Sequence, residues 1–96
     1  MSDLDPLPII RDHFESINLS SQERKDVEAT FTALAILLGR KAIGDDVEDR
    51  LKQVQAQALL WKSGAYAAVY SAFWAAAKDY AEKLGELLKS TVKGLI

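Results

Sequence analysis

The sequence predicts an all-α protein that forms a single domain over residues 1–96. Apolar residues recur at three- and four-residue spacing along most of the chain, and no stretch alternates apolar and polar residues long enough to form a strand. Only 2 prolines and 5 glycines are present, which leaves little length for loops. A chain of 96 residues also lies within the range of one domain.

The first helix is short and is expected over about residues 8–17. Pro8 suits a first helical turn, because its φ angle is already helical and its missing N–H would have no partner there. The apolar residues that follow are spaced by three or four and end before Asn18, which is an acceptable stop. They are Leu7, Ile10, Phe14 and Ile17.

The second helix is expected over about residues 21–43. Ser20 stands three residues before Glu23, which is the capping-box pattern of a helix start. Gly44 supplies a stop, with Gly39 as an earlier alternative. One face carries the main apolar stripe, which consists of Val27, Phe31, Leu34 and Leu38. The opposite face is mildly apolar as well, through Ala29, Ala33 and Ile36.

The third helical segment is expected over about residues 46–92. Asp45 and Glu48 repeat the capping pattern, and no proline follows them. The sequence leaves open whether this segment is one helix or is kinked or broken at Ser63–Gly64. An unbroken helix would be about 70 Å long, so a partner chain would have to cover it. A break gives four helices, which can close as a bundle. We expect oligomerisation to complete the bundle.

The uncharged stretch over residues 63–77 is the most unusual part of the chain. It contains 7 alanines and 4 aromatic residues but no leucine or isoleucine. Two apolar stripes overlap here, and aromatic rings together with small residues are typical of a helix–helix interface. We therefore predict an interface made of Trp61, Tyr66, Tyr70, Phe73, Trp74, Tyr80 and Leu84, with Ala68, Ala72 and Ala75 allowing close approach.

Little in the sequence favours catalysis, a metal or a cofactor. Cysteine is absent, and His13 is the only histidine. Because neighbours on a helix point about 100° apart, Asp12 is poorly placed to orient the His13 ring. An acidic cluster fits the start of a helix better than a divalent-cation loop. It consists of Asp45, Asp46, Glu48 and Asp49. We expect a protein that is not an enzyme and has no cofactor, metal or catalytic residue.

The charge and the first residues bear on partners and location. A net charge of −2 and a pI near 5.3 argue against nucleic-acid binding. The first residues are acidic and lack the features of a signal peptide, so we expect a cytoplasmic protein or a component of a particle assembled there. The segment 78–96 is amphipathic, which leaves binding to a membrane surface as a less favoured option.

The prediction for function is a helical interaction or assembly subunit. It would self-associate or dock on a larger protein complex through the alanine and aromatic positions named above, and a viral or phage structural component is one such role. Two alternatives stay open. One is a membrane-surface protein that uses residues 61–96, and the other is a four-helix domain with an apolar ligand pocket.

Overall fold

The computed structural model describes residues 5–61 and 67–95, with side chains described for residues 5–61 and 67–86. These residues form four helices, and none of them lies in a strand. The all-α prediction is confirmed. The helices are α1 (Pro6–His13), α2 (Ser21–Ala42), α3 (Glu48–Leu59) and α4 (Ala67–Leu95).

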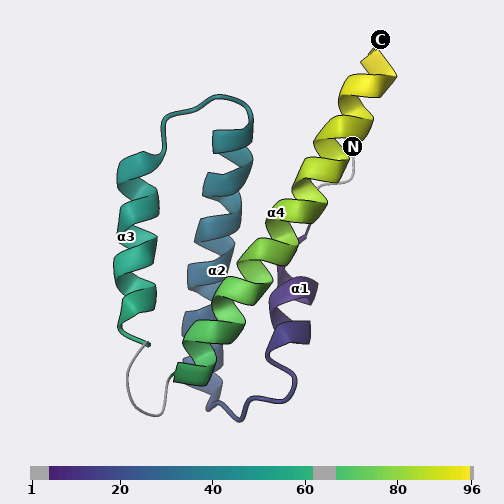
Figure 1. Cartoon of the computed structure of the whole chain (residues 1–96). Coiled ribbons are helices and arrows are strands. Elements are labelled where there is room, and N and C mark those ends of the chain that lie inside the picture. The colour runs from purple at the N-terminus through teal and green to yellow at the C-terminus, as the bar shows by residue number, and fades with distance from the viewer. Residues whose placement is uncertain (1–4, 62–66, 96) are drawn as a thin grey trace.

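The helices are arranged in two layers (Figure 1). Helices α2 and α3 form an antiparallel hairpin, and the longer α4 runs diagonally across α2 and away from α3. Helix α1 packs against both α2 and α4. The smallest dimension of the molecule is 18 Å, which matches two layers of helices. Within the described residues, α1 and α4 therefore pack on one side of the hairpin, mainly against α2, and no helix lies on its other side.

Helix α1 begins earlier and ends earlier than predicted. The Asp5 carboxylate accepts a hydrogen bond from the backbone N–H of Leu7 at 3.0 Å, so this residue is the N-cap. Phe14 is buried at the C-terminal end, and the chain turns there, with the N–H of Ile17 donating to the carbonyl of Phe14 at 3.1 Å. This turn, rather than Asn18, ends the helix.

Helix α2 has the caps that the sequence predicts. The Ser20 hydroxyl accepts from the N–H of Glu23 at 3.2 Å, and the Glu23 carboxylate accepts from the N–H of Ser20 at 3.0 Å. At the other end Gly44 has a φ angle of 96°. The N–H groups of Gly44 and Asp45 donate back to carbonyls of the last turn, which is a Schellman motif. Gly39 lies inside the helix.

Helix α3 starts two residues later than predicted, at Glu48. Val47 is the N-cap residue and is 3% exposed, so its side chain anchors the start of the helix in the core. The Asp46 carboxylate accepts from the N–H of Glu48 at 3.3 Å. Asp45, the predicted cap, instead forms an ion pair with Arg40 at 3.3 Å.

The predicted third segment consists of two helices, which decides between the alternatives left open above. Helix α3 ends at Leu59 and α4 begins at Ala67, and the two run in opposite directions (Figure 1). Ser63–Gly64 lies outside the described residues. The expectation of a partner chain depended on an unbroken helix. The four helices of the described residues share one core within a single chain, so this argument for a partner no longer applies. Oligomerisation stays a prediction.

The core lies where α1, α2 and α4 meet. Phe31, Phe73 and Ile10 are the largest fully buried side chains. The ring of Phe31 packs edge-on against Phe73, with centroids 5.6 Å apart, and against Tyr80 at 6.2 Å. Both halves of the predicted third segment contribute to this one core. The residues are Val47, which is the N-cap of α3, Val54 and Ala58 from α3, and Val69, Phe73, Ala76, Ala77 and Tyr80 from α4.

Candidate protein-binding surface

The predicted aromatic interface is divided between the core and the surface. Phe73 is 0% exposed and Tyr80 is 6% exposed, so both pack inside the chain. The ring of Phe73 also contacts Trp61 and Trp74, each with a centroid separation of 5.2 Å. For Phe73 and Tyr80 the structure therefore shows an intramolecular role, which is to hold α4 onto α2.

The other predicted interface residues are closer to solvent. Trp61, Ala72, Trp74 and Leu84 are half-buried and pack against the core, and Tyr70 is also half-buried. Ala68 and Ala75 are exposed. Tyr66 lies outside the described residues. We call four of these residues the α4 patch: the exposed Ala68 and Ala75 and the half-buried Tyr70 and Trp74.

Tyr70 and Trp74 of the α4 patch border a hollow of about 370 Å³ between α3 and α4. Gln55 and Leu59 line it from α3, and Tyr70 and Trp74 line it from α4. The two aromatic rings are 6.4 Å apart in an edge-on arrangement. Among the described residues, the buried Nε1 of Trp74 has no hydrogen-bond partner.

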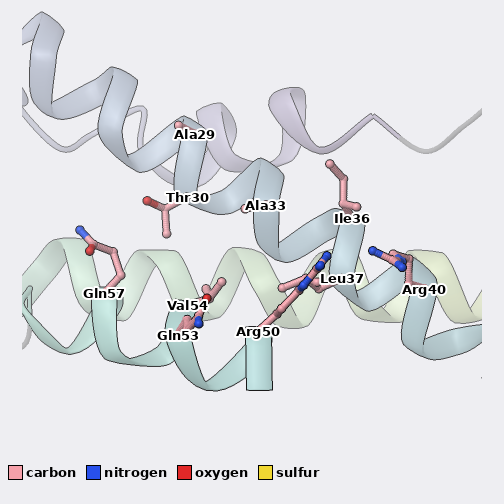
Figure 2. A pocket seen from close by; sticks show the side chains of 10 residues that line it. All are labelled: Ala29, Thr30, Ala33, Ile36, Leu37, Arg40, Arg50, Gln53, Val54 and Gln57. Carbon is pink, nitrogen blue, oxygen red and sulfur yellow. The ribbon is translucent and has the colours of Figure 1, made fainter. Parts of the chain in front are cut away.

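A larger open groove lies between α2 and α3 (Figure 2). Its volume is about 590 Å³. The lining residues are Ala29, Thr30, Ala33, Ile36, Leu37 and Arg40 from α2, and Arg50, Gln53, Val54 and Gln57 from α3. We call these ten residues the α2–α3 groove. Phe31 and Leu34 point from α2 into the core, so Ala29 and Ala33 lie on the opposite side of that helix.

The groove is open because the residues on this side of α2 are small. Ala29 and Ala33 are exposed and one helical turn apart, and neither side chain is long enough to fill the space toward α3. Leu37 and Val54 are buried at its base. Ile36 is 59% exposed at its edge, although isoleucine is among the residues most often buried.

The groove has positive charge at one end. Arg40 and Arg50 lie close together there (Figure 2), and they are the only charged residues in the lining. Arg40 forms its ion pair with Asp45 at 3.3 Å. Arg50 has no ion pair or hydrogen bond within the part of the chain that the structure describes. A guanidinium without a partner is available to a carboxylate from another molecule.

The sequence contained a weak signal for this groove. The mild apolarity of Ala29, Ala33 and Ile36 marked a second face of α2, but it did not show that α3 would lie beside that face. The groove depends on α3 turning back along α2, and this pairing follows from the tertiary fold. Arg50, Gln53 and Gln57 gave no signal of their own, since they read as ordinary solvent-exposed positions.

His13, the only histidine, takes part in a contact between helices. Its Nε2 lies 3.2 Å from Oδ2 of Asp79, and both side chains are about one-third exposed or less. The hydrogen bond from His13 lowers the pKa of Asp79, and Lys83 nearby adds to this effect. The contact joins α1 to α4 across 66 positions of sequence, which is why sequence spacing did not reveal it.

Other kinds of site are not evident within the described residues. No group of three or more histidine, cysteine, aspartate or glutamate side chains there could hold a metal ion. Within the described residues, no helix is both long enough and apolar enough to cross a membrane. No family model, curated protein or solved structure matches this chain.

Proposed function

We propose that this chain is a non-enzymatic helical interaction protein that assembles through the uncovered face of its α2–α3 hairpin. The observation that carries this proposal is the α2–α3 groove, an open apolar channel that faces away from the protein's own core. Exposed apolar surface of this kind on a small protein is typical of a protein-binding site. Ile36, 59% exposed beside two exposed alanines, is its most prominent feature.

The shape of the groove favours a helix as the bound element. Two parallel ridges of side chains with a channel between them accept a third helix, in the way that amphipathic helices bind grooves. Ala29 and Ala33 let another backbone approach α2 closely, because they carry no bulk beyond Cβ. Gln53 and Gln57 offer amide donors and acceptors along the other wall, which suits the polar margin of an interface.

The chemistry of the lining supports binding rather than catalysis. Thr30 is the one hydroxyl among the ten lining residues, and it donates to the backbone carbonyl of Asp26 at 2.8 Å. The remaining polar groups are guanidinium and amide groups, which position partners well but are poor nucleophiles and bases. We place this role in the cytoplasm or in a particle assembled there. The chain has no cysteine, and cytosolic proteins rarely rely on disulfides.

The α4 patch is proposed as a second, smaller contact. Ala68 and Ala75 are exposed, and Tyr70 and Trp74 form the side of a hollow. Tyrosine and tryptophan are frequent at the centres of interfaces. The more apolar side of α4, from Val69 to Tyr80, packs into the core, which favours a protein partner over a membrane surface for this part of the helix.

A photo-crosslinking amino acid placed at position 33 tests the proposal in the cells that naturally make the protein. We expect ultraviolet light to give a covalent adduct of defined mass, because Ala33 would lie inside the interface. The matched control is the same amino acid at Lys52, which is exposed on α3 and lies outside the groove lining. Equal adduct yields at the two positions, or none at position 33, would contradict a binding role for the groove.

A further inference from the structure

We propose that the occupant of the α2–α3 groove is α2 of a second copy of this chain, lying antiparallel about a two-fold axis beside Ala33. This inference rests on the proposed function and adds the identity of the partner and its register. It follows from the order of residues along the outer side of α2, from the charges at the two ends of that side, and from the small residues at its centre.

On the outer side of α2, residues lie at equal distances before and after Ala33. Positions three, four and seven residues away from a given residue share its face of a helix. A two-fold axis perpendicular to the helix reverses the direction of the partner, so each position before Ala33 meets the position equally far after it. The pairs brought together are Asp26 with Arg40, Ala29 with Leu37, and Thr30 with Ile36.

The charges select this orientation. Asp26 is exposed near the start of the outer side of α2. Arg40 lies near the end of that side, and Arg50 reaches the same end of the groove from α3. By the helical rise, Asp26 and Arg40 are about 21 Å apart within one chain, too far to pair. In the antiparallel dimer the carboxylate of each copy faces the two guanidinium groups of the other. A parallel arrangement would instead place Asp26 against Asp26 and arginine against arginine, which is unfavourable.

The centre of the outer side of α2 suits the crossing of two helices. Ala33 would face its own counterpart across the axis, and small residues at that point allow the two α2 helices to approach closely. Ile36 would then enter the partner's groove between α2 and α3 and lose its exposure to water, which is favourable. The two hairpins would then stack face to face, so that four helices form two packed layers, and an interface with two-fold symmetry closes at a dimer.

A second copy fits the groove better than an unrelated helix, because α2 itself has the small central residue and the carboxylate that the groove would accept. The groove requires a partner helix with small residues at its centre and a carboxylate about two turns before that centre. Helix α2 itself meets both requirements, with Ala33 at the centre and Asp26 seven residues earlier. Among the described residues, the Asp26 carboxylate accepts one side-chain hydrogen bond, from the exposed Gln22 at 3.1 Å, which leaves lone pairs for the arginines.

Sedimentation equilibrium on the purified full chain tests the inference through a charge exchange. The wild type should show a reversible dimer of twice 10.6 kDa. One variant carries Asp26→Arg, and the other carries Arg40→Asp with Arg50→Asp. Each variant alone would place like charges against each other at both ends, so each should dimerise about tenfold or more weakly than wild type. An equal mixture of the two should restore the dimer, because opposite charges then meet at both ends.

Two controls make the result specific. Lys52→Asp changes an exposed charge outside the groove and should leave the dimer constant unchanged. Thermal unfolding followed by circular dichroism checks that each variant folds, since all the substituted positions are exposed.

Three outcomes would overturn the inference. They are a wild type that stays monomeric up to millimolar concentration, a dimer indifferent to both variants, and variants that weaken the dimer without rescue on mixing. A monomeric wild type together with an adduct between position 33 and a different protein would overturn this inference alone and leave the proposed function in place. Absence of any adduct at position 33 would remove the proposed function itself.

Discussion

At the scale of single residues, the contact between His13 and Asp79 gives the structure a dependence on pH. Asp79 has a pKa lowered first by the hydrogen bond from His13 and then by Lys83. A carboxylate whose pKa is lower in the folded state stabilises that state above the ordinary pKa, which is 3.8 here. This stabilisation is lost as the pH falls below 3.8 and through the lower folded pKa.

We therefore predict that Asp79→Asn lowers the free energy of unfolding at neutral pH and makes it less dependent on pH in the acid range. Urea unfolding of wild type and variant at pH 7 and at about pH 3 measures both effects. The two proteins should differ more at pH 7 than at pH 3, because protonation removes the same charge that the substitution removes. An equal difference at both pH values would show that the carboxylate charge does not matter.

At the scale of helices, the end of α2 depends on the backbone of one glycine. Gly44 has a φ angle of 96°, a conformation that residues with a Cβ rarely adopt, and no atom lies within 4 Å of the place where a Cβ would be. Gly39 lies inside α2 and also has free space around it. The two glycines differ in backbone conformation and not in crowding.

The substitution Gly44→Ala should destabilise the fold by about 1–2 kcal/mol, which is the cost of the left-handed conformation for an L-residue. Gly39→Ala should stabilise it by about 0.5–1 kcal/mol, because alanine loses less entropy in a helix interior. Thermal or urea unfolding of the two single variants measures the pair. Effects of the same sign would mean that α2 does not end as the structure shows.

Much of the helix pattern could be predicted from local sequence, and its exceptions have tertiary causes. Both ends of α2 followed from Ser20, Glu23 and Gly44, because capping involves only neighbouring residues. Helix α3 starts later than predicted because Val47 is drawn into the core, and local capping patterns do not contain that information. The break between α3 and α4 could be foreseen only as an alternative, since the choice depends on whether both apolar stripes face one core.

The binding surface was less predictable than the helices. Aromatic residues in an uncharged stretch indicated burial but not the side from which they are buried. Phe73 and Tyr80 pack against Phe31 of α2 in the same chain, and only part of the predicted interface remains exposed. The α2–α3 groove arises from two segments that are unremarkable separately, so it becomes visible only when α3 lies beside α2.

At the scale of the whole molecule, the two-layer arrangement leaves the hairpin with one uncovered face. Helices α1 and α4 cover the side that carries Phe31, and the side that carries Ala33 and Ile36 faces solvent (Figures 1 and 2). Association through this face would give the hairpin a helical layer on both sides. Association through the α4 patch would leave the groove open. The α2–α3 groove and the α4 patch share no residue, so the two kinds of association can be distinguished residue by residue.

The most direct test of the central claim is a concentration series of backbone amide NMR spectra of the wild-type chain. The amide shifts of Ala29, Ala33, Ile36, Gln53 and Gln57 should move together on dilution, because these residues leave a shared interface as the assembly dissociates. The amides of Ala68, Tyr70, Trp74 and Ala75 should change little. Concentration-dependent shifts confined to this second set would contradict assembly through the α2–α3 groove and place it on the α4 patch.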